Sequence, residues 1–170
     1  MSLKLHTKEV NLLSLILENE STALNIKGKN DIYGILQGNE FIQSNNGEPE
    51  IIIYIKFTGM VNITKILIDS KPENIDNIPD KLKIFANSSN TDFSDVASNT
   101  PTELVNLEGK LGNKIGLNIS KFRKVSELVL YFNKEDADFI QLNSIQFYGT
   151  PGEGLFNIDK MKKQKEGKKI

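Results

Sequence analysis

The chain lacks several residue types on which common active sites depend. Its 170 residues contain no cysteine, no tryptophan and one histidine, His6. Without cysteine there is no disulfide, thiolate zinc site or cysteine nucleophile, and the composition fits a reducing compartment. The one histidine, His6, lies in a polar N-terminal segment, so a Ser-His-Asp triad would require this segment to fold back onto the rest of the domain. A histidine-based metal site has too few ligands. We therefore expect no enzyme activity, no catalytic residue, no resident metal and no cofactor.

The chain also has no strong excess of either charge and no long apolar run. Its formal net charge is -1. Nucleic-acid-binding domains usually carry a clear positive excess, so no nucleic-acid partner is expected. The apolar stretch at residues 10–17 is interrupted by Asn11 and Ser14, and no run reaches the roughly 18 apolar residues that a membrane helix needs. We expect a soluble protein without a membrane partner, located in the cytoplasm, with the nucleus left open as a second compartment.

Alternation of apolar and polar residues predicts several short β-strands. In IIIYIKF, residues 51–57, the odd-numbered positions are all apolar and share one face, which is the period of a strand. Thr58 and Gly59 are expected to end this strand, and ITKILIDS, residues 63–70, to form a neighbouring one. The same alternation predicts strands at 81–87, 127–133 and 144–149, and weaker patterns at 41–44, 103–107, 114–119 and 139–142.

Short strands separated by turn signals, with no long helical periodicity between them, favour an antiparallel sandwich. With about eight strands, the expected fold is all-β, an antiparallel jelly-roll β-sandwich. Residues 10–18 are either a helix or an irregular apolar segment covering a sheet edge, and residues 87–99 are expected to form a polar loop. GTPGEG, residues 149–154, is predicted to be a turn rather than a phosphate loop, because no lysine-serine pair follows it.

Acidic and basic residues gather in three places. The carboxylates of loops 76–80 and 135–138 could supply oxygen ligands, so whether these loops bind calcium is left open. The end of the chain, residues 156–170, is rich in lysine and poor in apolar residues, and we expect a flexible C-terminal tail there. The predicted organisation is an N-terminal extension at 1–9, a jelly-roll domain at 10–155 and this tail.

The order and spacing of several segments resemble the PITH domain family. These segments are ALN at 23–25, FIQSNNGEPEIIIYIKFTGMVNITKILID at 41–69, KLKIFANSSNTDFSDV at 81–96, FRKVSELVLYFNKEDADFIQLNSIQFYGTP at 122–151 and NIDKMKK at 157–163. The resemblance implies a galactose-binding-like jelly roll and association with the 26S proteasome. The thioredoxin-like domain of longer family members, with its CxxC, has no counterpart in this sequence. Ala23 stands where relatives often have cysteine, so no redox role is expected.

The resemblance therefore predicts a non-enzymatic module that docks, as a monomer, on the regulatory particle of the 26S proteasome. Phe93, flanked by Asp92 and Asp95, is a candidate anchor, or else folds back onto the core. Phe85 and Tyr131 occupy outward strand positions unless another element covers them. The lysines of the tail could steer the protein to an acidic surface. The candidate partner-binding residues are Phe93, Asp92, Asp95, Lys160, Lys162 and Lys163.

The alternative function is carbohydrate binding, since jelly rolls also carry sugar sites, although a fold alone does not determine function. Sugar sites usually combine polar groups with an aromatic platform. Tryptophan is absent, and Tyr33 is the main tyrosine expected outside the strands. Which proteasome subunit is contacted, and whether docking regulates degradation or delivers cargo, are questions that the sequence leaves open.

Overall fold

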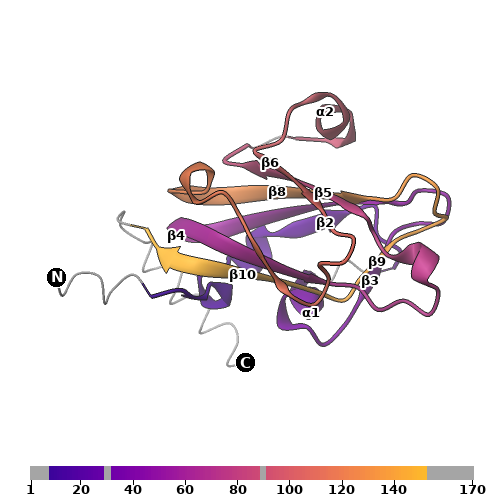
Figure 1. Ribbon diagram of the computed structural model, residues 1–170, viewed down its shortest axis with the longest axis horizontal. Coiled ribbons are helices and arrows are strands. Elements are labelled where there is room, and N and C mark those ends of the chain that lie inside the picture. The colour runs from indigo at the N-terminus through magenta and orange to yellow at the C-terminus, as the bar shows by residue number, and fades with distance from the viewer. Residues whose placement is uncertain (1–7, 29–31, 89–90, 153–170) are drawn as a thin grey trace.

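One long strand, β4 (Glu50–Asp69), belongs to both layers of a β-sandwich in the computed structural model (Figure 1). Its first half pairs with β2 (Thr22–Leu24) and β8 (Val125–Asn133). Its second half pairs with β7 (Lys114–Gly116) and β10 (Ser144–Pro151). All of these pairings are antiparallel. The structure describes residues 8–28, 32–88 and 91–152.

Shorter strands complete the sandwich. They are β1 (Val10–Asn11), β3 (Ile42–Gln43), β5 (Lys81–Ala86), β6 (Glu103–Asn106) and β9 (Gln141–Leu142). The first layer runs β2-β4-β8-β5-β6 and the second runs β1-β10-β4-β7, while β3 and β9 form a separate two-stranded sheet at one end of the sandwich (Figure 1). The all-β antiparallel prediction is confirmed, and the described residues form ten strands rather than about eight.

The core lies between the layers, and the predicted alternation places residues in it correctly. The odd-numbered residues from Ile51 to Phe57 are buried, as are Ile145 and Phe147 of β10. The rings of Phe57 and Phe147 meet edge to face, with centroids 6.1 Å apart. Such aromatic pairs add to the free energy gained from burial, so this contact helps to join the layers.

The expected break at Thr58 and Gly59 is wrong, because β4 continues through both residues. Its register with β8 shifts between Lys56 and Val61, where the strand changes from one layer to the other. Partners on either side of this irregularity satisfy the backbone groups of β4, which outweighs the local turn preference of the Thr-Gly pair.

Residues 10–18 do not form an α-helix. Val10 and Asn11 pair with β10, and two 3-10 turns follow, η2 (Leu13–Leu15) and η3 (Glu18–Glu20). Leu12, Ile16 and Leu17 are buried. The alternative prediction, an irregular apolar segment that covers a sheet edge, is the correct one.

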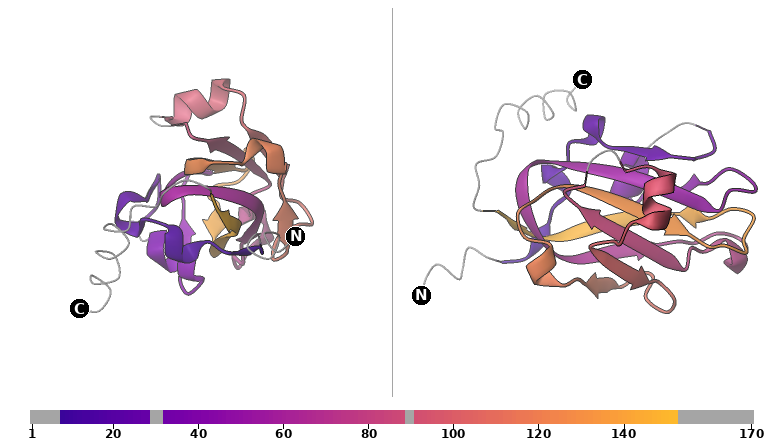
Figure 2. Two further views of the ribbon diagram at one scale, coloured as in Figure 1. Left: turned by 90° about the vertical axis from the view of Figure 1, so that its left-hand side faces the viewer. Right: turned by 90° about the horizontal axis from the view of Figure 1, so that it is seen from above.

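Two short helices were not predicted. Helix α1 (Ile32–Gln37) buries Ile32, Ile35 and Leu36 against the core. Helix α2 (Phe93–Ser98) replaces part of the expected polar loop and lies outside the first layer (Figure 2). Two further 3-10 turns are η4 (Ile75–Asn77) and η5 (Ile119–Lys121). Most of the proposed N-terminal extension and the whole proposed tail lie outside the described residues.

Candidate interaction site

Helix α2 covers the outer face of the first layer. Val96 is fully buried there, in a small apolar cluster with Ile52, Phe85 and Val129 that is separate from the main core. Phe93 is partly buried, and its ring meets that of Tyr131 edge to face, with centroids 6.4 Å apart. Phe85 and Tyr131 do point outward from the sandwich, as expected, but the helix covers Phe85 and half-buries Tyr131.

The two candidate aspartates shape the start of this helix. Asp92 is the N-cap, and its Oδ1 accepts a hydrogen bond of 2.9 Å from the backbone N–H of Asp95. Asp95 Oδ2 accepts one of 3.0 Å from the backbone N–H of Asp92. This reciprocal capping box satisfies two backbone donors that a helix start leaves unpaired. The Asp-x-x-Asp spacing is visible in the sequence, and it was the signal that could have revealed the helix.

Strand side chains hold both ends of α2 against the sheet. Lys83 Nζ donates a hydrogen bond of 2.8 Å to the carbonyl of Val96 and lies 6.0 Å from the centre of the Tyr131 ring. The Tyr54 hydroxyl donates to the carbonyl of Thr91, just before the helix. Burial raises the pKa of Tyr54, and the carboxylates of Asp92 and Asp95 raise it further. The hydroxyl therefore stays protonated and able to donate at neutral pH.

The structure thus brings three of the predicted site residues together at one end of α2. Asp92 is exposed, whereas Phe93 and Asp95 are partly buried. Phe93 takes an intermediate position between the two alternatives, since it packs on Tyr131 and still presents part of its ring to solvent. Lys160, Lys162 and Lys163 lie outside the described residues. Partner binding by all six residues stays a prediction.

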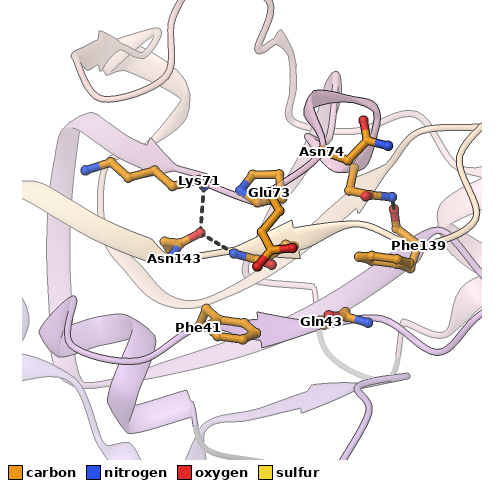
Figure 3. Close-up of a pocket in the computed structure, with 10 residues that line it drawn as sticks. Phe41, Gln43, Lys71, Glu73, Asn74, Phe139 and Asn143 are labelled. Atoms are coloured by element: carbon orange, nitrogen blue, oxygen red, sulfur yellow. Dashed lines mark hydrogen bonds between the residues drawn. The ribbon is translucent and has the colours of Figure 1, made fainter.

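A cleft of about 440 Å³ lies elsewhere, at the end of the sandwich where β3 and β9 pair (Figure 3). Three segments distant in sequence form it: residues 41–43, the loop 71–77 after β4, and residues 139–143. Phe41 is 56% exposed and Phe139 is partly buried. The ten lining residues are Phe41, Gln43, Lys71, Pro72, Glu73, Asn74, Asn77, Phe139, Gln141 and Asn143.

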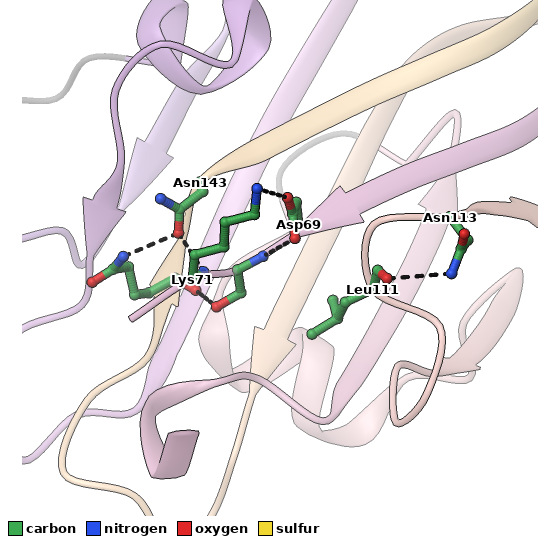
Figure 4. A network of polar contacts seen from close by, with 7 residues as sticks. Asp69, Lys71, Leu111, Asn113 and Asn143 are labelled. Carbon is green, nitrogen blue, oxygen red and sulfur yellow. Dashed lines mark hydrogen bonds and ion pairs between the residues drawn. The ribbon is translucent and has the colours of Figure 1, made fainter. Parts of the chain in front are cut away.

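Hydrogen bonds fix the polar wall of this cleft (Figure 4). Asn143 Oδ1 accepts from the backbone N–H of Lys71 at 2.7 Å and from Gln141 Nε2 at 3.0 Å. Asn77 Nδ2 donates to the carbonyl of Phe139 at 2.9 Å. The ammonium of Lys71 lies 3.2 Å from Asp69 Oδ2, so its charge already has a partner. Sequence reasoning missed this cleft, because no local pattern links its three segments.

Comparison with known proteins decides the family. The profile of the PITH domain matches residues 4–166. The chain belongs to the PITH domain family. PITH domain-containing protein 1 of Dictyostelium discoideum is 32% identical over 120 residues, which span 65% of this chain and 58% of that protein. The family assignment made from the order of the segments is therefore confirmed.

Solved structures support the jelly roll of this PITH domain. A family 32 carbohydrate-binding module from a family 31 glycoside hydrolase of Clostridium perfringens aligns with a TM-score of 0.57 and 15% identity, over 80% of this chain and 96% of the module. The F5/8 type C domain of a Bacteroides fragilis protein gives 0.54 and 11%, over 86% and 98%. The family 32 module of C. perfringens NanJ, solved with galactose, gives 0.52 and 10%, over 83% and 99%. These similarities confirm the galactose-binding-like fold and, at such low identity, the fold alone.

Neither a metal-binding cluster nor a membrane-spanning helix is found in the part of the chain that the structure describes. Within residues 8–28, 32–88 and 91–152, no group of three or more His, Cys, Asp or Glu side chains is placed to hold a metal ion. In the same part of the chain, no helix has the length and apolar content to cross a membrane. The PITH domain and the carbohydrate-binding modules that share its fold are non-catalytic module types.

Proposed function

We propose that this PITH domain is a non-enzymatic protein-interaction module that docks on the regulatory particle of the 26S proteasome. The observation that carries the proposal is the family match over residues 4–166, because the family resemblance implies proteasome association. With this function we expect the protein to act as a monomer in the cytoplasm or the nucleus, without nucleic-acid or membrane partners.

The outer surface around α2 suits such docking. Asp92 supplies an exposed charge and Phe93 a partly exposed aromatic ring, the type of residue that often anchors an interface. On the edge strand β6, Leu104 is 58% exposed and pairs across the sheet with Lys83, which holds α2. A stable interface buries on the order of 800 Å² on each partner, an area that one face of a sandwich can supply.

A pull-down of the tagged protein from a lysate of its own source tests the proposal. Co-eluting subunits are identified for the full chain, for a chain that ends at residue 155, and for the Phe93→Ala variant. We expect regulatory-particle subunits with the full chain and a reduced yield with Phe93→Ala. If the shortened chain still recovers regulatory-particle subunits, the jelly roll is the docking region. If the shortened chain recovers none, docking depends on the lysine-rich end. Absence of proteasomal subunits, where another PITH protein recovers them, would refute the proposal.

Carbohydrate binding is the second candidate, and the cleft is the observation that favours it. The cleft combines the exposed ring of Phe41 with several amide side chains, and structures with the same fold include a module solved with galactose. Tyr33, the expected platform, lies in helix α1 and not in the cleft. A glycan array probed with the tagged protein tests this function, and an array without hits would remove it.

A further inference from the structure

The cleft at the β3-β9 end contains a carboxylate without an ionic partner. Glu73 is exposed, and no ion pair to it is found among the described residues. Lys71, the lysine of the lining, is already paired with Asp69 at 3.2 Å. Figure 3 shows the Glu73 side chain reaching from its loop toward the side of the cleft where Phe41 lies. A cationic group entering the cleft would therefore meet an available negative charge.

Two buried amide side chains also line the cleft. Gln141 and Asn77 are each only 8% exposed. Gln141 donates through Nε2 to Asn143, and Asn77 donates through Nδ2 to the Phe139 carbonyl, at 3.0 and 2.9 Å. Their side-chain oxygens, Gln141 Oε1 and Asn77 Oδ1, accept no hydrogen bond from the residues that the structure describes. The best ligand is thus one with several donors and a positive charge.

Aromatic surface completes the set of groups. The rings of Phe41 and Phe139 both line the cleft, and Phe41 is 56% exposed. A planar guanidinium carries five N–H donors and no acceptor, pairs with a carboxylate through two parallel hydrogen bonds, and stacks on aromatic rings. An ammonium has no planar face, and a neutral sugar leaves the charge of Glu73 unpaired. An arginine side chain fits these three features better than either.

We propose that this cleft receives an arginine side chain of the docking partner, held by Glu73 and stacked on Phe41. This inference rests on the proposed protein-docking function and adds to it the chemistry of one contact. It also locates that contact away from α2, at the end of the sandwich where β3 and β9 pair. Docking would then use two separate regions of the domain.

The test is a titration of the isotopically labelled full chain with acetyl-Gly-Arg-Gly-amide, followed by NMR of the side-chain amides. We expect saturable shifts at Gln43, Gln141 and Asn143, with a dissociation constant on the order of 1 mM for so small a ligand. The same peptide with citrulline in place of arginine keeps the shape and loses the charge. Because a charge-assisted pair is lost, it should bind about 10-fold more weakly.

Variants of the protein supply the matched controls. Glu73→Gln should weaken binding of the arginine peptide about 10-fold, and Phe41→Ala should weaken it too, since both side chains are exposed and their replacement leaves the core intact. Glu108→Gln and Ile119→Ala change exposed side chains outside the cleft and should bind as the unchanged protein does. Equal affinity for the arginine and citrulline peptides, or an unaffected Glu73→Gln variant, would overturn the inference.

A third ligand separates this inference from carbohydrate binding. If galactose shifts the same amide signals and the arginine peptide shifts none, the cleft is a sugar site and the inference is overturned.

The pull-down separates the arginine inference from the proposed proteasome docking. If the protein recovers regulatory-particle subunits but does not bind the arginine peptide, the inference alone is refuted. If it binds the arginine peptide but recovers no regulatory-particle subunits, the proteasome proposal alone is refuted.

Discussion

The hydroxyl of Tyr131 donates a hydrogen bond to the carboxylate of Glu50, with 2.7 Å between the two oxygen atoms. The pair lies on the outer face of the first layer, next to Phe93 of helix α2. Burial raises the pKa of Tyr131 well above its ordinary value, and the hydrogen bond to Glu50 raises it further. The phenol is thus kept protonated as a donor to a partly buried carboxylate.

Removing this hydroxyl tests how much the pair contributes to stability. Tyr131→Phe keeps the ring against Phe93 and leaves Glu50 without its donor, so we expect the free energy of unfolding to fall by about 1–2 kcal/mol. The pH dependence has a definite sign. Because the folded pKa is raised, the contribution is fully present below about pH 10 and is lost as the pH rises above it. In urea unfolding between about pH 8 and pH 11, the free energy of unfolding of Tyr131→Phe should fall less steeply with pH than that of the unchanged protein. Equal declines would contradict this role of the Tyr131 hydroxyl.

Gly149 lies where β10 approaches its neighbour β4 too closely to leave room for a side chain. A Cβ atom placed there would be 1.9 Å from the backbone oxygen of Asn62, and the strand register shifts between Tyr148 and Gly149. Since the obstacle is backbone, Gly149→Ala should lower the free energy of unfolding by about 3 kcal/mol. Gly116→Ala in β7 is the matched control, because no atom lies within 4 Å of a Cβ there. Similar denaturation midpoints for the two variants would show that β10 can shift aside.

Glu9 connects the start of the chain to the outer face of the second layer. Its Oε2 accepts a hydrogen bond of 2.7 Å from Thr64 and lies 3.4 Å from the ammonium of Lys65, and its Oε1 lies 3.9 Å from that of Lys114. The hydrogen bond from Thr64, with help from the two lysines, holds the pKa of Glu9 below its ordinary value. A lowered folded pKa gives stability that is present above the unfolded pKa of about 4.5 and is lost as the pH falls through the folded pKa.

Glu9→Gln should therefore be less stable than the unchanged protein at pH 7, and the difference should shrink toward pH 3. Because Glu9 is partly exposed, we expect a loss of less than about 1 kcal/mol at neutral pH. Urea midpoints across this range measure it. Glu108→Gln, at an exposed carboxylate, is the control and should follow the unchanged protein at each pH. A constant difference between Glu9→Gln and the unchanged protein would point to packing rather than charge.

The alternation of apolar and polar residues predicted the sandwich, because each long strand turns one face to the core. In β4 and β10 this pattern is visible from the sequence alone. The same reasoning failed at Thr58 and Gly59, where pairing with neighbouring strands overrides a local turn preference. It also failed at α2, whose six residues are too few to show helical periodicity. Only the spacing of Asp92 and Asp95 marked that helix.

The cleft could not be predicted from the sequence, for a different reason. Phe41, Glu73 and Gln141 are separated along the chain and meet only because β3 pairs with β9 beside the end of β4. No window of sequence contains more than one of these segments. The α2 candidates were found because Asp92, Phe93 and Asp95 are close in sequence, although their structural role in capping and packing was not foreseen.

The same three residues allow structure and partner binding to be separated, because asparagine caps a helix as well as aspartate does. Asp92→Ala removes both the cap and the charge. It should lower the free energy of unfolding by about 1 kcal/mol and speed backbone hydrogen exchange in residues 93–98. Asp92→Asn removes the charge alone, so stability should remain while recovery of regulatory-particle subunits falls. Asp136→Asn, at another exposed aspartate, should change neither. If Asp92→Asn recovers as many subunits as the unchanged protein, the charge of Asp92 serves the helix and not the partner.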